Sequence, residues 1–161
     1  MPAFPEAGRL PSTVDVSVAT RYPSRTGARM ADRSPDWYEQ GKRNLEQARA
    51  SRRDGRHEWA CFAAHQAAEL AVKALHLKNL QEAWGHVVAR LLEELPLAVP
   101  EDLVEKAKVL DTFYIPSRYP NGHDEGPPFR HYGKIQSEDA IRYAGEILEF
   151  VRIRLAGTAG S

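Results

Sequence analysis

The segment from about Arg56 to Leu80 constrains the fold most, because it is apolar on nearly every face of a helix. One face carries Trp59, Phe62, Ala63, Gln66, Leu70, Ala74 and Leu77, and a second face carries Ala60, Ala64, Ala67 and Ala71. Alanine permits the close approach of a neighbouring helix, and a helix that is apolar all round lies at the centre of its bundle. The segment therefore predicts a central helix surrounded by others.

Four further segments repeat apolar residues at helical spacing. The expected helices run from Ser34 to about Arg53, from about Gly85 to Leu95, from Pro100 through Phe113, and from Ser137 to Leu155. Ser34 is expected to cap the first of them and Ser137 to begin the last. No segment alternates convincingly as a strand does. The sequence predicts an all-α protein, an up-and-down four-helix bundle with an additional short helix.

The two ends of the chain differ from this pattern. Residues 1–33 mix Pro, Gly, Ser, Thr and five arginines without helical or strand periodicity, and we expect them to be a disordered leader. Residues 34–156 form the expected bundle, and residues 157–161 a flexible tail. Met30 lies just before the first helix, so either Met1 or Met30 can be the native start.

Composition limits the classes of partner. Lys and Arg together number 22, as do Asp and Glu, so any RNA contact has to be local and cannot depend on a general basic field.

Cys61 is the single cysteine, which excludes an internal disulfide, and its Ala-rich segment predicts inert packing. No segment reaches the ~20 apolar residues needed to span a membrane. We expect a cytoplasmic protein without membrane contact.

The segment from Phe113 to His123 interrupts the helical pattern with aromatics, prolines and an Arg/His pair. Arg118 carries a permanent charge suited to phosphate oxygens, and His123 can move a proton near neutral pH. One hypothesis is that Arg118 stabilises charge on a scissile phosphate while His123 exchanges protons with the ribose or the leaving oxygen. The alternative is that Arg118 pairs with a carboxylate of the bundle and His123 lies on a loop. Arg52 and His57 share the spacing, so spacing alone proves little.

A polar stripe runs along the central helix at intervals of three and four residues: Gln66, Glu69, Lys73 and His76. Glu69 can pair with Lys73 across one helical turn. One interpretation is that Gln66, Glu69 and Lys73 face a cleft, where they orient Arg118 or bind a nucleotide or RNA. The other is a solvated edge or a polar strip in a dimer contact.

Four other residues carry chemistry. His65 points to a different face of the central helix, which indicates a structural role. His86 precedes an apolar run and is interpreted as capping or pinning the short helix, with catalysis as the alternative. Tyr114 and Tyr119 can stack a base or anchor their loop to the bundle. The histidines and carboxylates between residues 123 and 131 fit no standard metal site, so we expect neither a metal nor a cofactor.

Three pieces of the chain resemble the HEPN family of small helical-bundle proteins. They are Trp59 to Leu75, Gly85-His86 leading into Leu91-Leu92, and Tyr114-Ile-Pro-Ser-Arg-Tyr-Pro120. The resemblance implies an intracellular helical bundle, usually a homodimer and often the toxin-like partner of a minimal nucleotidyltransferase. Many members are metal-independent ribonucleases with an arginine, four to six residues and then a histidine, a pattern that Arg118 and His123 match.

The Arg118 segment departs from the family pattern in two respects. Tyr119 follows the arginine where members usually carry a polar residue, and Pro120 and Gly122 prevent a regular helix before His123. Two functions therefore stay open: a metal-independent endoribonuclease, and a non-catalytic helical module that binds a nucleotide or another protein. A helical, dimer-facing His123 would favour cleavage, and a His123 exposed on a loop would favour binding.

Overall fold

The computed structural model of the chain describes residues 31–157. Its elements are α1 (Ser34–Arg53), α2 (His57–Lys78), α3 (Val88–Glu93), α4 (Glu101–Asp111), the 3₁₀ turns η1 (Pro120–Gly122) and η2 (Pro128–Arg130), and α5 (Lys134–Gly157). No strand occurs in this range, so the all-helical prediction is confirmed. No helix within it is both long and apolar enough to cross a membrane. The leader and tail expectations fall mainly on residues 1–30 and 158–161, outside the described residues.

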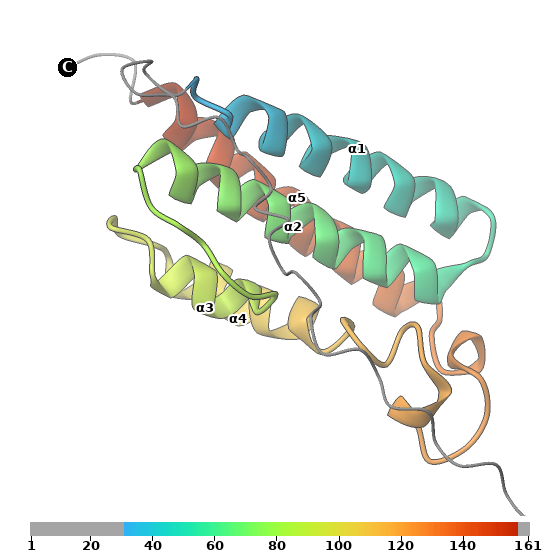
Figure 1. Cartoon of the computed structure of the whole chain (residues 1–161). Coiled ribbons are helices and arrows are strands. Elements are labelled where there is room, and N and C mark those ends of the chain that lie inside the picture. Colours follow the sequence, from blue (N-terminus) through green and yellow to red (C-terminus); the bar gives the residue numbers. More distant parts are fainter. Residues whose placement is uncertain (1–30, 158–161) are drawn as a thin grey trace, which may run out of the picture. The chain divides into compact units, whose positions relative to one another are not determined.

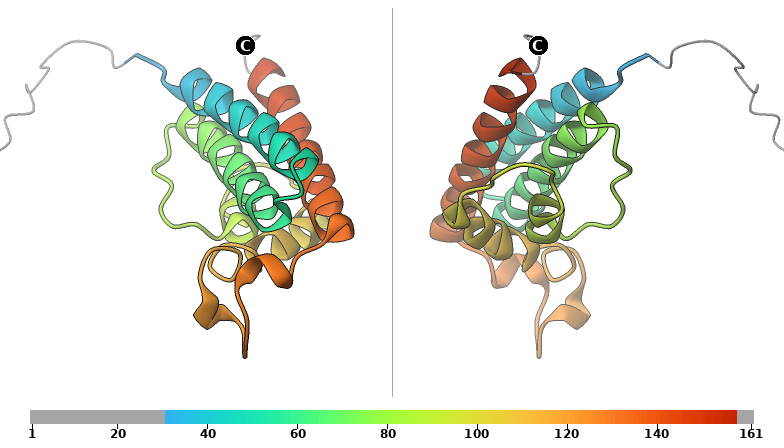
Figure 2. Two further views of the ribbon diagram at one scale, coloured as in Figure 1. Left: turned by 90° about the vertical axis from the view of Figure 1, so that its right-hand side faces the viewer. Right: turned by 90° about the vertical axis from the view of Figure 1, so that its left-hand side faces the viewer.

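The three longest helices form the body of the bundle. Helices α1, α2 and α5 lie side by side and contact one another, with the chain reversing direction between α1 and α2 (Figure 1). Helices α3 and α4 pack together against α2, and α4 also contacts α5 (Figure 2). Helix α2 touches all four other α-helices, as its apolar faces predict. The connection that carries η1 and η2 extends from one end of the bundle.

The alanine face of α2 lies directly against the backbone of α1. A Cβ atom built on Gly41 of α1 would lie 3.0 Å from the carbonyl oxygen of Ala67 and 3.3 Å from the amide nitrogen of Ala71. Both alanines are completely buried. The absence of a side chain at Gly41 and the small side chains opposite therefore set the spacing of the two helices.

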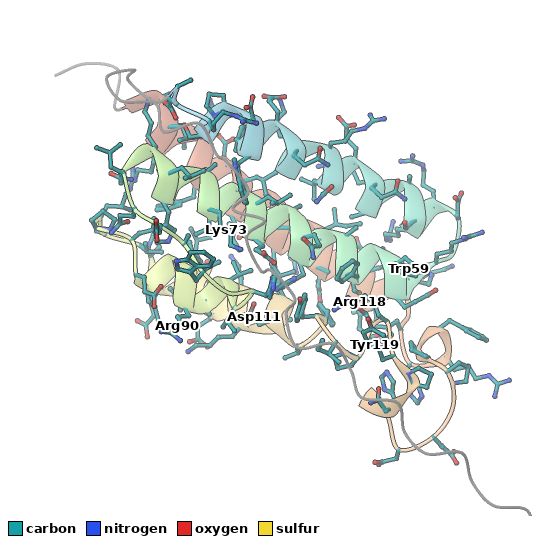
Figure 3. All side chains as sticks on the ribbon, in the orientation of Figure 1. Trp59, Lys73, Arg90, Asp111, Arg118 and Tyr119 are labelled. Carbon is teal, nitrogen blue, oxygen red and sulfur yellow. The ribbon has the colours of Figure 1, made fainter. Side chains whose placement is uncertain are left out.

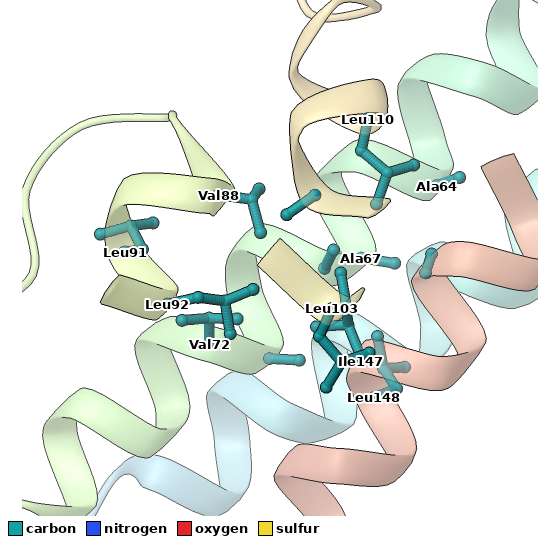
Figure 4. Close-up of a cluster of buried hydrophobic side chains, with 14 of the residues drawn as sticks. Ala64, Ala67, Val72, Val88, Leu91, Leu92, Leu103, Leu110, Ile147 and Leu148 are labelled. Carbon is teal, nitrogen blue, oxygen red and sulfur yellow. The ribbon is translucent and has the colours of Figure 1, made fainter. Parts of the chain in front are cut away.

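A single hydrophobic core joins α2 to α3, α4 and α5 (Figure 4). Its members include Ala64, Ala67, Val72, Val88, Leu91, Leu92, Leu103, Leu110, Ile147 and Leu148. Burying one such leucine or valine contributes about 1.5–3 kcal/mol. Cys61 lies in the same core, and its burial raises the pKa of the thiol to about 12. The prediction of an inert, packed cysteine is confirmed.

Three expected helix starts differ from the structure. The short helix expected from about Gly85 begins at Val88. Ser34 does not cap α1 but is its first residue, and both its amide and its hydroxyl donate to the carboxylate of Asp32, at 2.9 and 2.6 Å. Helix α5 begins at Lys134, three residues before Ser137. Ser137 is buried inside the helix, where its hydroxyl lies 2.8 Å from Nδ1 of His57. Ser137 therefore forms a tertiary contact with α2 and does not cap α5.

Candidate functional site

Arg118 lies beside the end of α2 that carries Trp59 (Figure 3). Its Nε donates to the carbonyl of Tyr114 at 2.9 Å. Its Cζ lies 4.3, 4.7 and 5.1 Å from the ring centres of Phe62, Tyr114 and Tyr119, three rings that we call the aromatic collar. Cation–π attraction and stacking hold a guanidinium in such a setting.

No carboxylate of the described residues pairs with the terminal nitrogens of Arg118. Within residues 31–157 Arg118 forms no ion pair, so the expectation that it pairs with a carboxylate of the bundle is not met there. A half-buried guanidinium that is oriented by rings suits an incoming phosphate or carboxylate.

A second group of polar residues lies further along α2. Glu69 accepts a hydrogen bond from Nζ of Lys73 at 2.9 Å, as the polar stripe predicts. The same oxygen, Oε1, lies 3.0 Å from Nδ1 of His86 in the connection between α2 and α3. The Glu69 side chain is buried, whereas that of His86 is 53% exposed. Glu69 and His76 of the stripe thus face this connection and α3: His76 is buried and lies 3.1 Å from Oε1 of Gln81 and 2.7 Å from the carbonyl oxygen of Leu91.

His65 and Asp111 form hydrogen bonds that hold the backbone at His86 and the start of α3 in place. His65 is completely buried, and its Nε2 lies 2.9 Å from the carbonyl oxygen of His86 and 3.2 Å from Oδ1 of Asp111. Asp111 accepts from the first amides of α3, those of Val88 and Ala89, at 2.7 and 3.0 Å. Asp111, rather than His86, therefore caps α3, and His65 has the structural role expected of it.

Tyr114 connects the two groups of side chains. The ring of His86 stacks on it at 4.9 Å and 19°, and His65 packs against it at 5.2 Å. Arg118 contacts the same tyrosine at 4.7 Å. The sequence-predicted residues Glu69, Lys73, Tyr114 and Arg118 are thus joined, together with His86, in one continuous network of contacts.

His123 contacts a different set of residues, Pro116, His131 and Tyr132. It follows η1, and its Nε2 lies 2.8 Å from the carbonyl oxygen of Pro116. Its ring stacks on His131 with ring centres 4.0 Å apart and an interplanar angle of 2°, and it forms a T-shaped contact with Tyr132. Within residues 31–157 no hydrogen bond or ring contact joins His123 to Arg118.

A surface groove of about 390 Å³ runs between α1 and α2 next to Arg118. It is lined by Asn44, Gln47, Ser51, Asp54, Arg56, Trp59, Phe62, Ala63 and Gln66. Phe62 belongs both to this groove and to the aromatic collar, so the groove and the Arg118 site are contiguous. Gln66, predicted to bind a ligand, lines the groove and shares no hydrogen bond with Glu69 or Lys73 among the described residues.

Sequence reasoning missed Phe62 and Asp111 as parts of the site. The periodicity places Phe62 on an apolar face, and its position one turn before Gln66 also puts it next to the polar stripe. Asp111 is the last residue of α4, and nothing local in the sequence links it to α3, 22 residues earlier.

Across the described residues, no three His, Cys, Asp or Glu side chains are grouped so as to hold a metal ion.

The comparisons with known proteins agree with this architecture. TT1696 from Thermus thermophilus is 52% identical, covers 76% of this chain and 98% of its own, and has a TM-score of 0.74. ST0689, an archaeal HEPN homologue, is 37% identical over 75% and 96% of the two chains, with a TM-score of 0.66. The HEPN domain protein TM0613 from Thermotoga maritima is 32% identical over 75% and 98%, with a TM-score of 0.63. A comparison with curated proteins gives no match.

The family model described as the HEPN domain matches residues 34–154, which span α1 and nearly all of α5. The match includes all the site residues described above. The chain belongs to the HEPN family.

Proposed function

We propose that this HEPN protein binds single-stranded RNA at the aromatic collar and cleaves it as a metal-independent endoribonuclease. The observation that carries the proposal is the guanidinium of Arg118, which three rings orient and no carboxylate neutralises among the described residues. Such a group can bind a phosphate and stabilise the charge that develops on it during cleavage. Cleavage itself is supported by the family resemblance.

The neighbouring rings favour a single strand over a duplex. Tyr119 and Trp59 are 49% and 46% exposed, and exposed aromatic rings bind bases by stacking. A base can stack in this way only when it is not already stacked within a helix. The amides of Asn44, Gln47 and Gln66 line the adjacent groove and can hydrogen-bond to the edge of a base.

Expression toxicity tests the proposal in cells. The chain, its Arg118→Ala variant and its His123→Ala variant would be produced separately in a bacterial host, with sequencing of the RNA ends. We expect slowed growth and new RNA ends with the unmodified chain, and neither with Arg118→Ala. Equal growth and intact RNA in all three strains would contradict nuclease activity under those conditions.

A non-catalytic module that binds a nucleotide or another protein is the second candidate. It is favoured by His123, whose ring is engaged with Pro116 and His131 on a loop rather than presented from a helix. Incubation of the purified protein with labelled single-stranded RNA separates the two functions. Binding without shortening of the RNA would support the module, and shortening in the presence of EDTA would support the metal-independent nuclease.

The proposed setting is a cytoplasmic homodimer that partners a minimal nucleotidyltransferase in a toxin–antitoxin pair. Large apolar side chains exposed between α2 and α3, including Leu80, Trp84 and Val87, offer surface for protein contacts. Light scattering should give twice the chain mass of 18.1 kDa. Co-expression with a nucleotidyltransferase encoded beside the gene should yield a complex and relieve toxicity. A monomer that neither co-purifies with nor is restrained by that protein would contradict this setting.

A further inference from the structure

We infer that His86, oriented by Glu69, is the group that takes the proton from the ribose 2′-hydroxyl at the RNA site. The inference rests on the function proposed above and deepens it. It assigns acid–base chemistry to the connection between α2 and α3 instead of to His123. Four features of the described residues carry it: the tautomer of His86, the burial of Glu69, the position of Tyr114 and the engagement of His123.

The bond to Glu69 fixes the tautomer of His86. A carboxylate only accepts hydrogen bonds, so the 3.0 Å contact between Nδ1 and Glu69 Oε1 places the ring proton on Nδ1. The lone pair then lies on Nε2, which makes no hydrogen bond with any other described residue. Because the side chain is 53% exposed, this lone pair is accessible to a ligand. A carboxylate behind an imidazole with a free Nε2 is the arrangement of a general base.

The Glu69 carboxylate is buried, unlike an ordinary surface carboxylate. Its side chain is only 5% exposed, and its second oxygen, Oε2, is buried without a hydrogen-bond partner among the described residues. Lys73, whose side chain is 12% exposed, supplies the compensating charge at 2.9 Å. A buried, incompletely bonded carboxylate is costly to stability and therefore indicates a functional constraint.

Their shared contact with Tyr114 limits how far apart His86 and Arg118 can lie. The His86 ring and the Arg118 guanidinium each lie within 5 Å of the Tyr114 ring centre. One nucleotide can span such a separation: hydrogen bonds of about 3 Å from a guanidinium to a phosphate oxygen, and from the adjacent 2′-hydroxyl to an imidazole, bridge groups roughly 10 Å apart. Both groups can thus contact the same phosphodiester.

His123 is less suited to the same task. Its Nε2 is occupied by the carbonyl of Pro116 at 2.8 Å, and its ring stacks on His131 and packs at a steep angle against Tyr132. A carbonyl oxygen accepts, so Nε2 of His123 carries the ring proton and cannot accept another there. These contacts give His123 a role in shaping the loop that follows Arg118.

The proposed step is a transesterification that consumes no other reactant. Nε2 of His86 accepts the proton of the 2′-hydroxyl as the 2′-oxygen forms a bond to phosphorus. The bond between phosphorus and the 5′-oxygen breaks, and this oxygen takes a proton from solvent. Arg118 stabilises the additional negative charge in the transition state. The products are a 2′,3′-cyclic phosphate and a free 5′-hydroxyl, and the imidazolium returns its proton to solvent.

Matched asparagine variants test the assignment. His86→Asn keeps a donor that can reach Glu69 but removes the base, and His123→Asn makes the same change on the loop. The probe is a fluorescein-labelled, mixed-sequence RNA 20-mer, with binding measured by anisotropy and cleavage by gel. We expect His86→Asn to bind within about threefold of the unmodified protein and to cleave at least 100-fold more slowly. His123→Asn should retain most of its cleavage activity.

The outcomes separate this inference from the proposed function. Loss of cleavage in His123→Asn with activity retained in His86→Asn would overturn the assignment and leave the nuclease intact. RNA binding without any cleavage by the unmodified protein would also overturn the assignment, while leaving the binding site at Arg118 in place. No RNA binding by the unmodified protein would remove the proposed function itself. The products must also carry 2′,3′-cyclic phosphate ends, and RNA with a 2′-deoxy linkage must stay intact.

Glu69 acts through His86 and is a positioning residue, so its test needs a readout of the imidazole. In ¹⁵N-resolved NMR spectra the unmodified protein should show His86 with its proton on Nδ1. Glu69→Gln should give a mixture of the two tautomers and lower kcat about tenfold or more with little change in KM. An unchanged tautomer together with an unchanged kcat would reject the role of Glu69.

Discussion

The guanidinium of Arg118 is held by rings, so its shape should matter as much as its charge. Arg118→Lys keeps the charge but loses the planar contacts with Phe62, Tyr114 and Tyr119. Cation–π contacts of this kind contribute about 0.5–2 kcal/mol. We therefore expect RNA binding, measured by anisotropy, to weaken by roughly tenfold. Arg130→Lys is the control, because its nearest ring contact is Phe129. Equal effects of the two substitutions would contradict the role of the collar.

At the residue scale, the sequence singled out several residues that lie together at the candidate site, but not the contacts that join them. Arg118, Tyr114, Glu69 and Lys73 stood out because they carry charge or an aromatic ring at positions that break an apolar pattern. The pairing of Glu69 with His86 could not be predicted, because the connection between α2 and α3 has no periodicity that fixes where His86 points. That direction depends on the bond between buried His65 and the carbonyl of His86.

Two glycines, Gly41 in α1 and Gly145 in α5, should respond to alanine substitution with opposite changes in stability. Gly41→Ala would bring a methyl group to 3.0 Å from the carbonyl oxygen of Ala67, and this backbone of α2 cannot yield as a flexible side chain would. We expect a loss of about 1–3 kcal/mol in the free energy of unfolding. Gly145→Ala, in α5, meets no atom within 4 Å and should add about 0.5–1 kcal/mol through helix propensity. Urea denaturation measures both, and a stabilised Gly41→Ala would show that the helices can separate freely.

Asp32 predicts a pH dependence at the start of α1. Hydrogen bonds from Ser34 and from Lys78 lower the pKa of the Asp32 carboxyl to about 2, from 3.8. The ionised group therefore stabilises the folded state above about pH 4, and this contribution is lost as the pH falls from 4 to 2. Asp32→Asn should be less stable than the unmodified protein at pH 7, with equal stability near pH 2. A difference in stability that stays constant over this range would contradict the assignment.

Helix ends show why the elements were predicted better than their boundaries. The apolar period identified all five helices, because each buries a stripe in one core. It placed the start of α5 at Ser137, since serine before two acidic residues is typical of a cap, whereas the helix begins at Lys134. The contact of Ser137 with His57, 80 residues away, determines the environment of that serine and leaves no local signal.

Over the whole molecule, the balance of charge predicts a weak dependence of RNA binding on salt. The formal net charge is zero, and at the proposed site Lys73 is already paired with Glu69. Arg118 then provides one main phosphate contact, so log Kd should rise with log salt with a slope of roughly 1. A titration over salt concentrations of about 0.05–0.3 M, which brackets the physiological range, would measure it. A slope of about 5 would indicate an extended basic surface instead of a local site.

The central position of α2 also bears on the timing of synthesis. Phe62, His86 and Arg118 precede α5 in the chain, yet α2 carries the site on one side and packs against α5 on another. Because a domain folds as a unit, the nascent chain lacks a stable site until α5 has left the ribosome. For a protein proposed to cut RNA, this order keeps the active form absent while α1 to α4 are being synthesised.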